Sequence, residues 1–301
     1  MSLSIYNLKR WMKMISGKSI YHVDQGLGQV IDKGGYYNDL TQKVLLGQDT
    51  LNDSGIPEMI DKNGSHIQMP TMIFQYGLGA YDLWLLTSEQ HYLDKAIKCS
   101  DWAVLHQLYN GAWDNFSFIY PNYPYSAMSQ GEGISLLLRT WKATSNERYI
   151  ESARKAFLFL TTSVEDKGVM ILNGNEVLFK EYVQKPTILN GWVFSLFGLY
   201  DYSLYESNHM VNQLWNKSID TLVNHLSIYD NDYWTMYNED GLIASPFYHK
   251  LHVAQMEALY ILTHRKVFKE YGLKWKKEQK NIFFYCMAFI KKAVQKIIEK
   301  E

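Results

Sequence analysis

The sequence predicts a mainly α-helical protein, an incomplete (α/α) toroid in which helix pairs ring a cleft, preceded by a short N-terminal segment of loops and strands. Two observations predict this fold. Apolar residues recur at helical spacing in paired stripes, and the pairs repeat roughly every 55–60 residues. Tyr149, which opens the second helix of one pair, follows its counterpart Tyr92 by 57 residues. Helix pairs that repeat a few times bury their stripes against one another and can curve into a ring.

The elements follow in order along the chain. Residues 21–70 lack helical periodicity and are rich in glycine, which indicates loops and short strands packed on the ring. Four helix pairs come next, with apolar stripes over 73–84 and a partner from 92, over 134–141 and a partner from 149, over 192–202 and 219–226, and over 252–260. We therefore divide the chain into an N-terminal segment (1–60), a toroid domain (61–280) and a basic amphipathic C-terminal helix (281–301).

Composition places the chain among ordinary globular proteins. With 301 residues, 47% apolar and 20% charged, it can bury a sizeable core, and disorder or a coiled coil is excluded. Its 23 tyrosines and 9 tryptophans suit stacking on sugars, although a large core uses such rings equally well. Two cysteines give no disulfide framework, and no apolar run has the length of a signal peptide core or a membrane span. These features predict a cytoplasmic protein.

Charge is distributed unevenly along the chain. Residues 1–20 carry four Lys or Arg and no acid, residues 265–301 carry eleven against four acids, and the stretch between has a net charge of −12. The acidic body and the lack of a DNA- or RNA-binding motif argue against nucleic acid as a partner.

The C-terminal tail combines apolar and basic residues at helical spacing. Its apolar residues run from Ile282 to Ile297, with Lys291, Lys292 and Lys296 between them. This pattern fits a helix docked on its own domain, or one that binds an anionic membrane peripherally through the basic ends of the chain. Both alternatives stay open. In the second, the helix would bind the inner face of the cell membrane.

Tyrosine, histidine and glutamate gather in the loops between helix pairs, where a rigid scaffold can carry function. These loops contain Tyr120 to Gln130, Glu181 with Tyr182, Tyr233 to Tyr237, and Tyr248 with His249 and His252. Taken singly, each is more often a packing residue than a catalytic one. No motif for zinc, phosphate, a nucleophilic serine or a dinucleotide is present. The residues therefore predict a tyrosine-rich cleft without a metal or cofactor.

Three segments together resemble the D-glucuronyl C5-epimerase family. They are Gln75–Tyr76–Gly77–Leu78, the stretch from Tyr125 to Gly131, and Leu189–Asn190–Gly191 continuing to Asp201. Their order and intervals also match, and the likeness extends from about Gly55 to about Lys280. Animal members carry an additional N-terminal β-rich region, and we expect no counterpart of it in these 301 residues.

The resemblance implies C5 epimerisation of D-glucuronate residues to L-iduronate within a polysaccharide or a lipid-linked glycan, with no cofactor. The reaction removes a hydrogen α to a carboxylate and returns it to the opposite face, so it needs a base, an acid and a partner for the carboxylate. A uronate lyase or unsaturated-uronide hydrolase on the same toroid, and a non-catalytic glycan-binding protein, stay open as alternatives. The sequence also leaves the oligomeric state open, with a homodimer among the options.

The family's catalytic tyrosines carry over onto Tyr182, Tyr237 and Tyr248, with Glu181 beside the first. We expect Glu181, which is ionised near neutrality if it is exposed, or a deprotonated Tyr182 as one base and Tyr248 as the acid on the opposite face. Tyr237 would then orient or stabilise the carboxylate. The expected substrate-binding residues are Tyr125, Gln130, Asn190, His249, His252 and Gln75.

The chain departs from its animal relatives directly behind Tyr237. It carries the acidic stretch Asn238–Glu239–Asp240 where those relatives have a basic residue, so a heavily sulfated substrate is not expected. The cation that meets the substrate carboxylate must then come from elsewhere. The candidates are Lys180, Lys185, His249, Lys250, His252 and Arg139.

Overall fold

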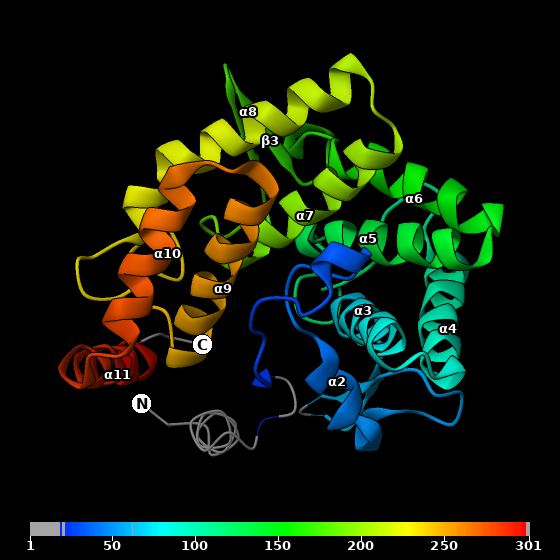
Figure 1. Cartoon of the computed structure of the whole chain (residues 1–301), viewed down its shortest axis with the longest axis horizontal. Coiled ribbons are helices and arrows are strands. Elements are labelled where there is room, and N and C mark those ends of the chain that lie inside the picture. Colours follow the sequence, from blue (N-terminus) through cyan, green and yellow to red (C-terminus); the bar gives the residue numbers. More distant parts are fainter. Residues whose placement is uncertain (1–18, 20–21, 62, 299–301) are drawn as a thin grey trace.

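The computed structural model describes residues 19, 22–61 and 63–298, and helices dominate this part of the chain. Eight of its α-helices form four consecutive pairs, which follow one another along an open arc (Figure 1). The pairs are α3 (Pro70–Thr87) with α4 (Gln90–His106), α5 (Ala127–Thr144) with α6 (Glu147–Leu160), α7 (Leu189–Tyr205) with α8 (His209–His225), and α9 (Pro246–Thr263) with α10 (Lys266–Gln279). The predicted mainly α-helical toroid is confirmed.

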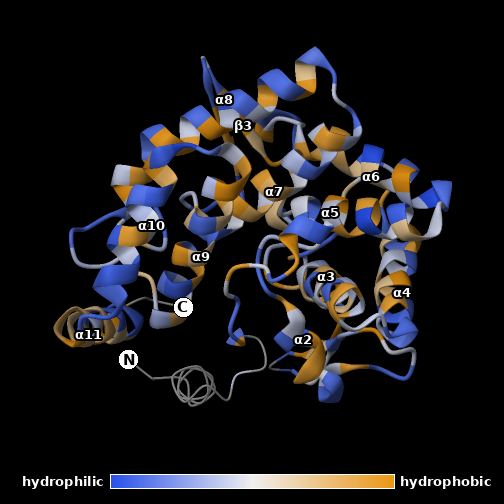
Figure 2. Cartoon of the chain, viewed as in Figure 1, coloured by the Kyte–Doolittle hydropathy of each residue, from blue (hydrophilic) through white to orange (hydrophobic). Residues whose placement is uncertain are grey.

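The first helix of each pair lies on the inner side of the arc and is the more deeply buried. All residues of α5 from Ala127 to Thr140 are buried, whereas α6 is amphipathic and buries one face. Figure 2 shows hydrophobic residues along α7 and hydrophilic ones on the outer helices α8 and α10. The backbones of α5 and α7 touch, because a Cβ added to Gly198 would lie 2.4 Å from the Cα of Gly131. Glycine at both positions allows this close crossing.

Short turns join the two helices within a pair, and longer connections lead to the next pair. The inner helices α3, α5 and α9 end at Ser88, Ser145 and His264, each in the left-handed conformation and each bonding back to a carbonyl of the last turn. Residues 107–126, 161–188 and 226–245 return from an outer helix to the start of the next inner helix. Because the inner helices run in one direction, these connections gather at one end of the ring. The second contains the hairpin of β3 (Met170–Asn173) and β4 (Glu176–Phe179).

The N-terminal segment is part of the core and not a loose cover. It contains a short helix α2 (Thr41–Leu45), two 3-10 turns (Ile31–Lys33 and Gln48–Thr50) and the hairpin of β1 (Met59–Ile60) with β2 (His66–Ile67). Loops and short strands were expected here, and α2 is a helix too short to leave a periodic signal. Tyr36 and Leu40 are fully buried, and Arg139 of α5 donates to the carbonyl of Gly35. The predicted basic stretch at Lys9, Arg10, Lys13 and Lys18 lies outside the described residues.

A last helix, α11 (Ile282–Ile298), follows α10 and packs against the segment that precedes α9. Ala288 of α11 packs against Trp234, Ile243 and Ala244, and Gln295 accepts a hydrogen bond from the Ile243 N–H at 3.0 Å. The described residues include no helix whose length and apolar character would let it cross a membrane.

Candidate active site

The Glu181–Tyr182 segment is fixed at the start of two inner helices. The neighbouring Lys180 donates its N–H to Val169, and its carbonyl accepts the first N–H of α5, that of Ala127, at 2.9 Å. The carboxyl of Glu181 then lies against the first turn of α7, where a Cβ on Gly191 would be 2.2 Å from Glu181 Oε2. Only a glycine fits there, which explains the Leu189–Asn190–Gly191 segment in physical terms.

Backbone hydrogen bonds bring Tyr237 and Tyr248 to the same place. Tyr237 lies on the irregular hairpin before α9, and its carbonyl accepts the N–H of Leu189, the first residue of α7, at 3.2 Å. Tyr248 stands in the first turn of α9, which Ser245 caps by accepting the Tyr248 N–H. The rings of Tyr237 and Tyr248 are 4.8 Å apart, and Tyr182 stacks on Phe116 with ring centroids 4.2 Å apart.

The other three predicted catalytic residues all influence the pKa of Tyr237. Burial, followed by the nearby Tyr248, Glu181 and Tyr182, raises the pKa of Tyr237 well above its usual range. The hydrogen bond between Tyr237 and Tyr248 acts in the same direction, as expected when the Tyr237 hydroxyl is the donor. Residues from two inter-pair connections and from α9 therefore share one site.

Glu181 differs from the exposed, ionised base that the sequence suggested. It is buried, its Oε2 has no hydrogen-bond partner among the described residues, and burial raises the pKa of its carboxyl to about 8. At neutral pH both Glu181 and Tyr237 are therefore protonated. The condition of exposure is not met, because Glu181 packs against the backbone of α7, which the sequence could not show.

Lys292 is a site residue that the sequence did not single out. It lies on the docked face of α11 and is 7% exposed, and its ammonium group is 5.5 Å from the centroid of the Tyr237 ring. In the sequence it is one of three lysines interleaved with the apolar residues of the C-terminal helix. Only the docking of α11 separates it from Lys291 and Lys296, which are exposed.

Most of the other candidate cations are engaged elsewhere. Arg139 forms a buried ion pair with Asp201 at 2.5 Å and holds the N-terminal segment, while Lys250 pairs with Asp24. Lys180 is close to Thr187, and Lys185 lies 5.8 Å from the ring centroid of Tyr120, which in turn meets Tyr182 edge-on. Of the candidates named from the sequence, only Lys180 and Lys185 stand on the site's own loops.

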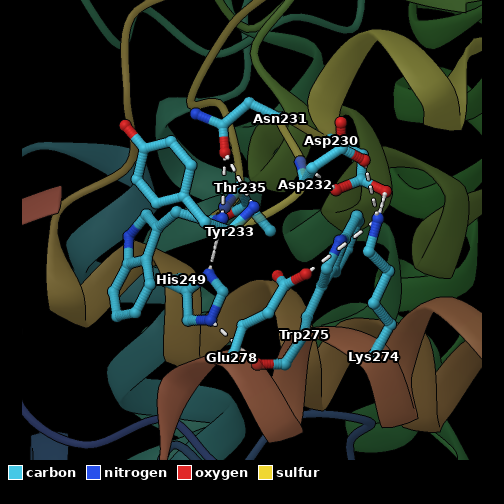
Figure 3. A network of polar contacts seen from close by, with 10 residues as sticks. Asp230, Asn231, Asp232, Tyr233, Thr235, His249, Lys274, Trp275 and Glu278 are labelled. Atoms are coloured by element: carbon cyan, nitrogen blue, oxygen red, sulfur yellow. Dashed lines mark hydrogen bonds and ion pairs between the residues drawn. The ribbon is translucent and has the colours of Figure 1, made fainter. Parts of the chain in front are cut away.

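His249 and His252 link the segment that carries Tyr237 to the helices α9 and α10. Thr235, two residues before Tyr237, donates its N–H to His249 Nδ1, and His249 Nε2 bonds the carbonyl of Trp275 on α10 at 3.0 Å (Figure 3). The Thr235 hydroxyl bonds Nδ1 of both histidines at 3.0 Å. Burial lowers the pKa of His249 to about 4 and holds the pKa of His252 well below its usual range, so both rings are neutral.

This network corrects the role expected for His249. Its ring is fully buried, stacks on Trp234 and has both nitrogens bonded within the protein, so it offers no atom to a substrate carboxylate. Lys274 of α10 adds an ion pair to Asp230 at the base of the same hairpin (Figure 3). His249 is therefore a positioning residue for Tyr237 and for its own neighbour Tyr248.

The remaining predicted binding residues occupy two environments. Tyr125 packs edge-on against Phe159 and bonds Asn110, so it fixes the loop before α5. The others belong to a set of buried polar side chains on the inner helices, in which Gln75 donates to Glu132 at 2.8 Å. Several atoms of this set have no hydrogen-bond partner in the described part: those of Gln130, Glu132 Oε2, Asn190 Oδ1, His252 Nε2 and Gln255 Oε1. Glu132 and Gln255 were missed, although each is a polar residue inside an apolar helix stripe.

These atoms all belong to side chains of the inner helices α5, α7 and α9. Among the described residues, no three His, Cys, Asp or Glu side chains are arranged to hold a metal ion.

Comparison with known proteins identifies the family. Residues 114–277, just over half of the chain, match the family model described as the D-glucuronyl C5-epimerase C-terminus. The chain belongs to the D-glucuronyl C5-epimerase family. It is 30% identical over 161 residues to the D-glucuronyl C5-epimerase of Caenorhabditis elegans, covering 46% of this chain and 26% of that protein. An uncharacterized protein of Methanocaldococcus jannaschii is 26% identical over 172 residues, which are 54% of this chain and 56% of that one.

The chain thus spans about a quarter of the length of the first relative and just over half of the second.

Solved structures share its fold. Cellobiose 2-epimerase from Bacillus thermoamylovorans superposes with a TM-score of 0.54 at 10% identity, covering 79% of this chain and 70% of that one. Unsaturated glucuronyl hydrolase from Bacillus sp. GL1 gives 0.50 at 12% identity, covering 69% and 61%. The family predicted from the three sequence segments is confirmed, and the structural likeness concerns the toroid alone.

The buried carboxyl of Glu181 makes a testable contribution to stability. Its pKa of about 8 in the folded protein exceeds the ordinary value of 4.5, so the stability present below about pH 4.5 is lost as pH rises through 8. Glu181→Gln removes this loss. We expect the variant to equal the wild type near pH 4 and to exceed its free energy of unfolding by about 2–4 kcal/mol at pH 8.

Urea unfolding of both proteins between pH 4 and pH 9 measures the difference. Glu270→Gln, at an exposed position on α10, is the matched control and should show no such trend. A stability gain for Glu181→Gln that stays constant across this range would contradict a buried, protonated carboxyl.

Proposed function

We propose that the protein catalyses C5 epimerisation of D-glucuronate residues to L-iduronate residues in a glycan. The observation that carries the proposal is the convergence of Glu181, Tyr182, Tyr237 and Tyr248 at one end of the toroid in a chain of this family. Epimerisation at a carbon next to a carboxylate needs two proton-transfer groups that reach opposite faces of that carbon. Here Glu181 and Tyr182 come from the loop before α7, and Tyr248 comes from the first turn of α9.

The proposed reaction breaks the C5–H bond on one face and forms it again on the other. Glu181, or Tyr182 beside it, takes the C5 proton, and the electron pair of that bond moves onto the carboxylate as an enolate. Tyr248 gives its hydroxyl proton to the opposite face of C5. Tyr237 donates a hydrogen bond to Tyr248 and so stabilises the tyrosinate left behind until a proton returns to it. The product differs from the substrate only in configuration at C5.

The substrate carboxylate needs a cation, because its enolate carries two negative charges. We assign this role to Lys292, which already lies against Tyr237 in a nearly buried position. A carboxylate entering without such a partner would raise the pKa of Glu181 above 8 and keep the base protonated. Lys292 therefore supports both the binding of the substrate and the ionisation of the base.

Glu239, in the acidic stretch behind Tyr237, has a structural explanation that fits this assignment. Its carboxylate accepts the N–H of Thr187 at 3.0 Å and meets His225 at 3.4 Å. It therefore braces the hairpin that carries Tyr237. Glu239 adds a negative charge behind Tyr237, and Lys292 of α11 supplies the cation. We therefore expect the substrate to be a non-sulfated glucuronate polysaccharide or its lipid-linked precursor.

Solvent exchange tests the proposed function. The protein is incubated in deuterated water with a non-sulfated glucuronate polysaccharide, and NMR follows the C5 position. We expect deuterium at C5 together with iduronate signals, at a rate that rises with pH through about 8 as Glu181 ionises. Accumulation of a 4,5-unsaturated product would indicate a lyase, cleavage of an unsaturated uronide a hydrolase, and tight binding without exchange a glycan-binding protein. Each of these results would overturn the proposal.

Tyrosine hydroxyls can be removed with the rings kept in place. Tyr182→Phe and Tyr248→Phe are each expected to lower the rate of epimerisation by roughly 10²–10⁴-fold, the range of a lost general acid or base, with little change in melting temperature. Tyr109→Phe, at a fully exposed position, is the control. Full activity in both Tyr182→Phe and Tyr248→Phe would remove the two-face mechanism.

The role of Lys292 is tested by Lys292→Gln, which keeps much of the side-chain length and removes the charge. We expect kcat/KM for the glycan to fall about 10–100-fold, as for the loss of one charge-assisted contact in a buried site. Lys277→Gln, at an exposed position on α10, is the control. An unchanged kcat/KM in Lys292→Gln would leave Lys180 or Lys185 as the partner of the carboxylate.

A further inference from the structure

The outer face of α11 is a continuous apolar surface. Ile282, Phe283, Ile290, Val294 and Ile298 are 75%, 66%, 62%, 48% and 65% exposed. At 100° per residue these five side chains occupy a single arc of the helix, and the exposed Cys286 and Met287 fill the same arc. The opposite side, with Ala288, Lys292 and Gln295, is the one docked on the hairpin before α9. This outer apolar face is therefore turned away from the protein.

Basic residues border the outer apolar face on both sides. By the same helical geometry Lys291 lies at one edge and Lys296 at the other, and both are exposed. Residues 282–298 contain no Asp or Glu. Elsewhere, by contrast, large exposed apolar residues such as Leu158 and Leu204 lie on helices that also carry acids.

We propose that α11 binds the surface of an anionic lipid bilayer, lying in its plane with the outer apolar face among the acyl chains. An interfacial helix has an apolar face, flanking lysines that meet lipid phosphates, and too little apolar length to span the bilayer. A second copy of the chain fits less well, because packing two such faces together would bring the lysines at their edges close to one another. The inference does not depend on the reaction that the protein catalyses.

The docking of α11 determines how far Tyr237 would lie from a bound membrane. Lys292 projects from the opposite side of the same helix and touches Tyr237. A bilayer that takes up the outer apolar face therefore holds Tyr237 about one helix diameter, or about 10 Å, from the lipid surface. A glycan attached to a lipid in the same membrane would meet the site at that height.

Vesicle sedimentation of the full chain tests the proposal. We expect binding to vesicles of phosphatidylcholine with about a third phosphatidylglycerol, at least tenfold weaker binding to pure phosphatidylcholine, and weakening of the former as salt rises. The double variant Ile290→Glu/Val294→Glu should lose binding. Leu158→Glu/Leu204→Glu introduces the same charge at exposed leucines on α6 and α7, and should bind as the wild type does.

The lysines are tested separately. Lys291→Glu/Lys296→Glu should weaken binding to the anionic vesicles by at least about 25-fold, because each lysine near such a surface contributes roughly fivefold and the glutamates add repulsion. Lys142→Glu/Lys155→Glu, at exposed positions on α5 and α6, is the control.

Light scattering measures whether the protein is a monomer or a dimer in solution. Absence of vesicle binding by the wild type overturns the proposal, as does a dimer that Ile290→Glu/Val294→Glu converts to a monomer, because a second copy would then cover the face.

Discussion

The candidate site depends on the first turn of α7, where three separate parts of the chain are tied to one another. The N–H of Leu189 bonds the carbonyl of Tyr237, the carbonyl of Asn190 accepts from Gln255 of α9, and Gly191 leaves room for the carboxyl of Glu181. A helix start has N–H groups without partners inside the helix, so it can bind neighbouring loops in this way. The close crossing of α5 and α7 holds this turn in the middle of the molecule.

Burial at this junction determines the charge state of the site. A carboxyl and a phenol that lose water are held in their neutral forms, so Glu181 and Tyr237 are protonated in the free site. A substrate that brings a carboxylate adds negative charge to such a place, and a cation has to accompany it. Lys292 is suited to this because it is nearly buried and lies against Tyr237, whereas His249 and His252 are neutral and bond the Thr235 hydroxyl.

Helix α11 connects the site with the surface of the protein. Its docked face contributes Lys292, and its outer face presents apolar side chains between two exposed lysines. One helix can serve both purposes because successive side chains point in directions 100° apart, so neighbours such as Lys291 and Lys292 have different surroundings. The proposed membrane contact and the proposed carboxylate contact are therefore placed by the same docking of Ala288 and Gln295.

The sequence by itself determined the ring of four helix pairs, because burial against neighbouring helices imposes a spacing of three to four residues that can be read directly. The three family segments were likewise recognisable, since each is a run of adjacent residues. The short helix α2 escaped because five residues give no period. Tertiary structure alone decided that Glu181 is buried and protonated, that His249 supports the hairpin, and that Lys292 faces Tyr237 while Lys291 faces outward. The pKa of a side chain and the direction of a lysine depend on residues far away in the sequence, and only the packed fold brings those residues into contact.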